Sequence, residues 1–73
     1  MPIINVTTWK SDDKEMKKKL LQELTKTTHE VTGAPLDKIT VYIQEIERSE
    51  WAEAGITGDD SNFPIESRRK TYT

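Results

Sequence analysis

The sequence contains no cysteine and a single histidine, His29, among its 73 residues. The lack of thiols excludes disulfides and thiolate metal centres, and one imidazole cannot form a metal site alone. We therefore expect no metal and no other cofactor. A chain this short buries only about 60% of the surface that it exposes when unfolded. Association with further copies is the stabilising route that remains.

Basic residues are not in excess, since 11 Lys and Arg face 13 Asp and Glu for a net charge of −2. Proteins that bind nucleic acid normally carry a marked basic excess on one face, so this partner is not expected. No apolar run approaches the roughly 20 residues that span a bilayer. The opening MPIINVTT lacks the basic and apolar regions of a secretory signal. These features predict a cytoplasmic protein with no membrane partner.

Two strands and one helix are predicted from the residue pattern. Residues 3–9 are rich in β-branched and aromatic types, which favours a strand. From about residue 12 to 32, apolar side chains recur at spacings of three, four and seven, as on an amphipathic helix that Gly33 and Pro35 end. Residues 39–46 alternate between apolar and polar types, as in a second strand. The expected apolar stripe of the helix consists of Met16, Leu20, Leu21, Leu24 and Val31.

A strand, a long helix and a second strand form a β–α–β unit, whose strands should be parallel. The segment from Glu47 onward contains Gly55, Gly58 and Pro64 and is rich in turn-forming residues. We expect a short hairpin there, with an irregular tail over residues 61–73. The predicted fold class is α/β, with residues 1–73 as one domain.

One helix covers only one face of a two-stranded sheet. The other face, with Thr40, Tyr42 and also Val6, must then pack against something outside the chain. Exposed sheet faces and free strand edges favour association with other subunits. The architecture therefore predicts assembly into a larger oligomer.

Pro2 is the first candidate for chemistry. Initiator methionine is commonly removed when a small residue such as proline follows, and the loss of Met1 would leave a secondary amine at the start of a strand. An amine transfers protons efficiently only when its pKa lies near the working pH. Burial in an apolar pocket and nearby cations both lower the pKa of an amine. The competing interpretation is that Met-Pro is a common beginning without a function.

Four stretches together resemble the 4-oxalocrotonate tautomerase family: PII after Met1, KSDDKEMKKKLLQEL, TGAPLDKITVYIQEI, and the downstream Trp51. The resemblance implies β–α–β subunits that assemble into dimers and then hexamers (trimers of dimers), without a cofactor. It also implies that the amino-terminal proline moves a proton between an enol or dienol acid and its keto isomer. Relatives dehalogenate, hydrate or decarboxylate unsaturated acids around the same proline.

The resemblance assigns roles to individual residues. Pro2 matches the catalytic base, and Trp51 matches an aromatic residue that makes the pocket apolar. Lys10 falls where an arginine grips the substrate carboxylate, in a loop expected to border the proline. Thr40 falls where a second arginine, from a neighbouring subunit, polarises the substrate carbonyl. Lysine is a point charge without a planar fork, and threonine carries no charge, so both positions depart from the family pattern.

Candidate replacements for the missing arginine are Arg48, just after the second strand, and the pair Arg68–Arg69 in the tail. Solvated surface charge is the competing interpretation for each of them. The predicted function is an isomerase that binds a small unsaturated or enolisable carboxylic acid between the subunits of a homo-oligomer. The alternative is a non-catalytic subunit, or one subunit of a heteromeric enzyme in which a sister chain supplies the arginine.

Overall fold

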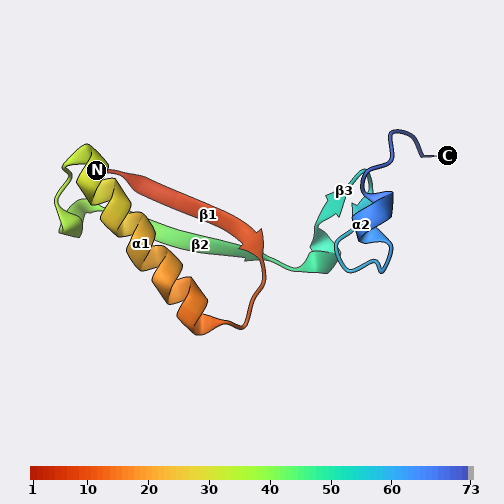
Figure 1. Cartoon of the computed structure of the whole chain (residues 1–73), viewed down its shortest axis with the longest axis horizontal. Helices are drawn as coiled ribbons and strands as arrows, with labels where there is room; N and C mark the ends of the chain where they lie inside the picture. The colour runs from red at the N-terminus through yellow and green to blue at the C-terminus, as the bar shows by residue number, and fades with distance from the viewer. Residues whose placement is uncertain (73) are drawn as a thin grey trace.

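The computed structural model describes residues 1–72 and contains the expected β–α–β unit. Strand β1 (Ile3–Trp9) leads into helix α1 (Lys14–Thr32), and strand β2 (Thr40–Ile46) follows. The two strands pair in parallel from Ile3 opposite Thr40 to Trp9 opposite Ile46. Figure 1 shows α1 lying along this pair of strands. The predicted fold class and the parallel pairing are confirmed.

The two faces of the sheet differ in exposure. Val6 lies opposite Ile43 in the register, and both are half-buried on the face that α1 covers. The expectation that Val6 lies on the bare face is therefore wrong, because alternation along β1 assigns it to the opposite side. On the bare face, Ile3 is 63% exposed and Tyr42 is 48% exposed. The sheet thus keeps apolar side chains in contact with solvent.

Helix α1 is capped at both ends, and its end at Gly33 is the expected one. The Asp13 side chain accepts a hydrogen bond from the Met16 backbone N–H at 3.0 Å, which caps the first turn. Gly33 has φ +75°, and its N–H donates to the His29 carbonyl oxygen at 2.9 Å. Val31 does not join the packed stripe and is 80% exposed. A helix of this length spans about 28 Å and seven strand residues about 23 Å, so one helix end extends beyond the sheet.

The loop between β1 and α1 is attached to β2 through one carboxylate. Glu45 accepts a hydrogen bond from the Ser11 backbone N–H at 2.7 Å through Oε2. Its other oxygen, Oε1, lies 3.0 Å from Nζ of Lys17. These two contacts lower the pKa of Glu45, with the Ser11 hydrogen bond as the larger cause.

We call residues 48–72 the C-terminal arm. Its elements are short: the 3₁₀ turn η2 (Arg48–Glu50), strands β3 (Ala52–Glu53) and β4 (Ile56–Thr57), and helix α2 (Phe63–Glu66). Strands β3 and β4 pair antiparallel, which confirms the predicted hairpin. Helix α2 lies in the segment that was expected to be irregular. Its second residue is a proline, which the first turn of a helix tolerates because no intrahelical N–H bond is lost there.

The hairpin turn is formed by Ala54 and Gly55, which have φ of +53° and +79°. Positive φ at both central residues is typical of a two-residue type I′ hairpin turn. Gly55 adopts this conformation without strain, whereas alanine does so at a cost. The turn therefore depends on its glycine.

The molecule is elongated, with principal extents of 52 × 25 × 15 Å. Its radius of gyration is 16.7 Å, against about 11 Å expected for a compact chain of this length. Figure 1 shows the arm and the N-terminus at opposite ends of the long axis. Among residues 1–72, no hydrophobic side chain is fully buried. Over the same residues, no helix is long and apolar enough to cross a membrane.

Candidate active site

Pro2 immediately precedes β1. Its carbonyl oxygen accepts a hydrogen bond from the Thr40 backbone N–H at 3.1 Å, which extends the strand pairing to the proline. Pro2 is half-buried, whereas Met1 is 84% exposed. While Met1 is attached, the Pro2 nitrogen belongs to an amide and is not basic. Removal of Met1 would free this nitrogen at a position that the sheet already fixes.

The start of β2 brings no charged side chain to the proline end, because Thr40 opens the strand there. The nearest cation before it in the chain is Lys38, at the end of the 3₁₀ turn η1 (Leu36–Lys38). Sequence analysis did not single out Lys38. Its position two residues before Thr40, at the entrance to the strand, was the available signal. A cation near this end favours the neutral form of an amine.

Lys10 lies at the other end of β1. Its Nζ is 3.2 Å from Oε1 of Glu47, and its backbone N–H donates to the Ile46 carbonyl oxygen at 3.0 Å. The hydrogen bond to Glu47, then the charges of Glu47 and Asp12, raise the pKa of Lys10. The loop with Lys10 was expected to border the proline. Within one chain it does not, because the whole of β1 separates Lys10 from Pro2.

Arg48 and Trp51 pack around Trp9, where the arm joins the sheet. The Arg48 guanidinium carbon lies 4.4 Å from the centroid of the Trp9 ring. The Trp51 ring meets Trp9 edge-on at 6.2 Å, and Phe63 lies 5.5 Å from it. We call Trp9, Arg48, Trp51 and Phe63 the aromatic cluster. Trp9 lies in the first predicted strand, and no pattern in the sequence connects it with Phe63, 54 positions further along the chain.

Gly58 lets the backbone of the arm pack closely against the aromatic cluster. Its N–H donates to the carbonyl oxygens of Arg48 at 2.9 Å and Trp51 at 2.8 Å. A Cβ at this position would lie 3.1 Å from both the Arg48 oxygen and Cζ2 of Trp9. Only glycine allows this approach without displacing the backbone or the ring. Trp9 Nε1 is buried and has no hydrogen-bond partner among the described residues.

Trp51 also forms part of a surface hollow. Its Nε1 donates to Oε2 of Glu53 at 2.9 Å. The hollow has a volume of about 240 Å³ and is lined by Thr7, Thr8, Trp9, Trp51 and Glu53. The location suits a pocket wall and equally suits an interface with another chain, so the role of Trp51 stays a prediction.

Lys10 and Arg48 line a second hollow, of about 420 Å³. Three carboxylates share it with the two cations and oppose the entry of an anion. Lys10 is already paired with one of them. The acidic residues of this hollow are Asp12, Glu47 and Asp59.

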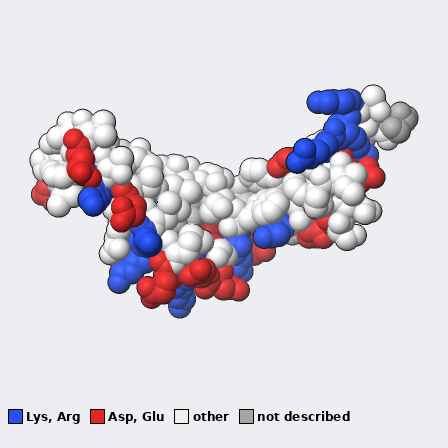
Figure 2. Space-filling model, in the orientation of Figure 1, with Lys and Arg blue, Asp and Glu red and all other residues white. Residues whose placement is uncertain are grey.

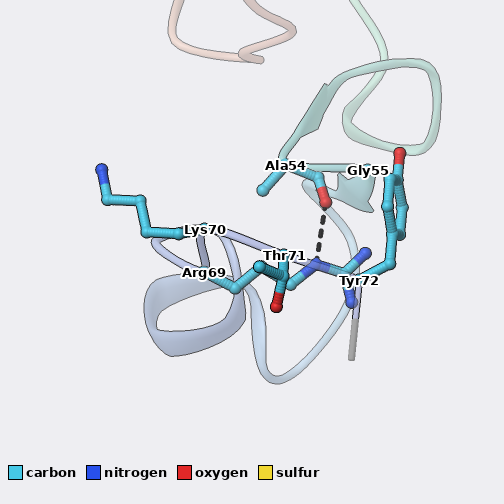
Figure 3. A pocket seen from close by; sticks show the side chains of 6 residues that line it. All are labelled: Ala54, Gly55, Arg69, Lys70, Thr71 and Tyr72. Carbon is cyan, nitrogen blue, oxygen red and sulfur yellow. Dashed lines mark hydrogen bonds between the residues drawn. The ribbon is translucent and has the colours of Figure 1, made fainter.

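Arg69 lies in a different setting, against the hairpin turn. Its Nε donates to the Ala54 carbonyl oxygen at 3.0 Å. Its guanidinium carbon lies 4.7 Å from the centroid of the Tyr72 ring. Figure 3 shows this arrangement, with Arg69 directed at Ala54 and Tyr72 beside Gly55. No carboxylate among residues 1–72 lies within ion-pair distance of Arg68 or Arg69, and Arg68 is the more exposed of the two.

The predicted site residues therefore form two groups, one at each end of β1. Pro2 stands at one end of β1, and Lys10, Arg48, Trp51, Arg68 and Arg69 follow the other end. Pro2 and Lys10 flank the seven residues of β1 and are therefore about 26 Å apart along the extended chain. Figure 2 shows a group of basic side chains at the outer end of the arm with acidic ones beside them, and mixed acidic and basic ones along α1. A small substrate cannot touch both groups within one chain.

Comparison with protein families matches residues 2–57 to the Tautomerase family, described as tautomerase enzyme. The chain belongs to this family. It is 34% identical over 55 residues to the 2-hydroxymuconate tautomerase of Bacillus subtilis, covering 75% of this chain and 89% of the relative.

Solved structures of similar fold include a 4-oxalocrotonate tautomerase homologue with a TM-score of 0.79 and 28% identity. The similarity covers 84% of this chain and 97% of the homologue. A heterohexamer 4-oxalocrotonate tautomerase from Chloroflexus aurantiacus has a TM-score of 0.77 at 23% identity, covering 84% of this chain and 98% of its own. The latter likeness establishes the fold alone.

Proposed function

We propose that this chain is the subunit of an oligomeric tautomerase in which Pro2, after removal of Met1, is the catalytic acid–base group. The observation that carries the proposal is the position of Pro2. The match to the Tautomerase family begins at residue 2, and the Thr40 N–H holds the proline at the start of β1. A fixed secondary amine beside a half-buried strand end is suited to proton transfer once its pKa is lowered.

The reaction would convert the enol form of a small unsaturated carboxylic acid into its keto form. The neutral Pro2 nitrogen takes the proton of the enol hydroxyl, and the electron pair of that O–H bond becomes part of the new carbonyl group. The carbon–carbon double bond shifts along the chain of the substrate. The protonated nitrogen then returns the proton to the carbon at the far end of the shifted electrons. The step needs neither a metal nor a cofactor.

The substrate carboxylate needs a cation, because an unpaired charge in an apolar pocket costs several kcal/mol. Pro2 has none of the predicted cations at its own end, so we propose that a second copy of the chain supplies one. The candidates are Lys10, Arg48, Arg68 and Arg69, with Trp51 as an apolar wall. The name of the Bacillus subtilis relative suggests a 2-hydroxymuconate-like acid as the type of substrate.

We propose a homo-oligomer, built from dimers, as the active form. The bare sheet face with Ile3 and Tyr42 and the lack of a fully buried hydrophobic side chain support this assembly. Sedimentation at micromolar concentration should give a species several times larger than the 8.4 kDa chain. A monomer under these conditions would contradict the proposal.

The second candidate function is a non-catalytic subunit, or one partner of a heteromeric enzyme. The observation that favours it is the uncharged Thr40 at the start of β2, where the family resemblance implies an arginine. Under this alternative the purified chain alone would be inactive on every enol tested. Activity would then require a sister chain.

The deciding experiment compares wild type with Pro2→Ala, after mass spectrometry has established that Met1 is absent from both. We expect the variant to lose about 10²-fold to 10⁴-fold in kcat/KM on a 2-hydroxymuconate-like or phenylpyruvate-like enol, as for other acid–base groups. The oligomer should remain intact. Equal rates in the two proteins would assign the chemistry to another group.

A further inference from the structure

We propose that the pocket between the β3–β4 turn and the end of the chain is a carboxylate site in which Arg69 grips the anionic end of the substrate. The inference rests on the proposed function for the identity of the ligand and adds which cation binds it. The pocket has a volume of about 170 Å³, and none of the residues among 1–72 that line it is acidic. It is lined by Ala54, Gly55, Arg69, Lys70, Thr71 and Tyr72.

Among residues 1–72, the contacts that orient Arg69 occupy one of its hydrogen-bond donors. A guanidinium has five N–H donors, and Nε uses one on the Ala54 carbonyl oxygen. The Tyr72 ring lies against the guanidinium and fixes its plane. The terminal nitrogens can then form the two parallel hydrogen bonds that a carboxylate accepts. Such pre-organisation reduces the entropy lost when the anion binds.

The other cations are less suited to this role. Lys10 is paired with Glu47, and Arg48 lines the hollow that contains three carboxylates. Figure 3 shows the Lys70 side chain extending away from Ala54 and Gly55. Within the described part of the chain, Arg69 therefore combines an oriented guanidinium, donors without a protein partner and a pocket lined by no acidic residue.

Gly55 is the positioning residue of this site. A Cβ on Gly55 would lie 3.1 Å from Cε1 and Oη of Tyr72 and 3.3 Å from Nη2 of Arg69. Its φ of +79° also disfavours any side chain. Replacement by alanine would thus strain the turn and shift the ends of both side chains by a few tenths of an ångström, while leaving every charge in place.

The planar Tyr72 ring suggests the shape of the ligand. It is 82% exposed in the single chain and offers a flat apolar wall beside the guanidinium. A conjugated acid can place its carboxylate on Arg69 and its planar carbon chain along the ring. The class of ligand is therefore a small, planar, unsaturated carboxylate.

The test measures binding without turnover, using adipate as an unreactive dicarboxylate, its neutral diamide, and the planar dicarboxylate muconate. Calorimetry on the assembled protein should give at least tenfold weaker adipate binding for Arg69→Gln and several-fold weaker binding for Gly55→Ala. The control for loss of a charge is Lys18→Gln, on the exposed side of α1, which should stay within about twofold of wild type. Arg69→Lys should bind with intermediate affinity, because it keeps the charge and loses the fork. The diamide should not bind, and muconate should bind more tightly than adipate.

Unchanged adipate affinity in an assembled Arg69→Gln protein would overturn the inference, and so would an equal loss in the Lys18→Gln control. If Arg69→Gln fails to assemble, Gly55→Ala and Arg69→Lys decide the question in the same way. Pro2→Ala separates the two proposals, since it should abolish turnover and keep adipate binding. Arg69-dependent binding with full activity in Pro2→Ala would reject the proposed function alone. Loss of activity in Pro2→Ala with Arg69-independent binding would reject the inference alone.

Discussion

The β–α–β unit and the C-terminal arm are held together in different ways. In the unit, seven residues of β1 pair in register with seven of β2, and α1 runs for 19 residues beside them. In the arm no element exceeds four residues. Its shape depends on individual side chains: Trp9 with its aromatic neighbours, the missing side chain of Gly58, and Arg69 on the hairpin turn.

This difference determines which changes each region can tolerate. A repeated backbone pattern survives the loss of one side chain, because the remaining residues keep the register. A segment attached by a few specific contacts loses its position when one of them is removed. The proline end belongs to the first kind of structure and the C-terminal arm to the second. Under the proposed function, the proton-transfer group would therefore be held rigidly, whereas the side that binds the carboxylate would be open to adjustment.

A site that takes its proline from one chain and its cation from another can be tested by mixing two variants, each impaired at one end of the chain. Pro2→Ala should be inactive through its proline end, and the double variant Arg68→Ala, Arg69→Ala should be weakened at its arm. When the two are unfolded and refolded together in equal amounts, about a quarter of the sites would take an intact proline and an intact arm from different copies. Activity in the mixture should therefore rise well above that of either variant refolded alone. No recovery would contradict a site shared between chains.

A second test removes the main contact between the β–α–β unit and the C-terminal arm. Trp9→Ala removes the ring that contacts Arg48, Trp51 and Phe63, and because Trp9 is half-buried we expect a loss of about 2 kcal/mol in unfolding free energy. Amide hydrogen exchange should increase in the arm more than in β1 and β2. The matched control is Trp9→Phe, which keeps a ring and gives up an Nε1–H that has no partner among the described residues. Uniform exchange throughout the Trp9→Ala chain would mean that the arm is not separately attached.

The β–α–β unit could be predicted from the sequence, whereas the contacts of the arm could not. Strand and helix periods depend on every second or every third to fourth residue, so the alternation in residues 39–46 and the terminator Gly33 were sufficient for the β–α–β unit. The aromatic cluster links Trp9 to Phe63 across 54 positions, and no local pattern encodes such a contact. The Lys10–Glu47 pair and the distance between Lys10 and Pro2 likewise follow from the direction of β1 in space. Chemistry-bearing residues were recognisable by type, whereas their grouping required the structure.

Gly58→Ala should have a smaller effect on the same junction. The added methyl would press on the Arg48 carbonyl oxygen and on the Trp9 ring, each at 3.1 Å, and overpacking of this kind costs about 1 kcal/mol or somewhat more. The measurement is the change in unfolding free energy together with exchange in the arm. Gly33→Ala is the control: it meets nothing within 4 Å and is disfavoured only by its φ of +75°. It should loosen the end of α1 and leave the arm unchanged, and an arm response to Gly33→Ala would argue against local attachment.

The smallest expected effect is a change in Tm on replacing one of two carboxylates, Glu45 in β2 or Glu47 just before the arm. Glu45 is tied to Ser11 and Lys17, and in its pair the side chains of Lys17 and Glu45 are 23% and 28% exposed. The Lys10–Glu47 pair is 55% and 54% exposed and should contribute little. Glu45→Gln should therefore lower Tm at pH 7 more than Glu47→Gln does. Because the folded pKa of Glu45 lies below its usual 4.5, its contribution is present above that value and is lost as the pH falls further. The Tm difference between wild type and Glu45→Gln should shrink on acidification through this range, and a difference independent of pH would assign the effect of Glu45 to packing instead of charge.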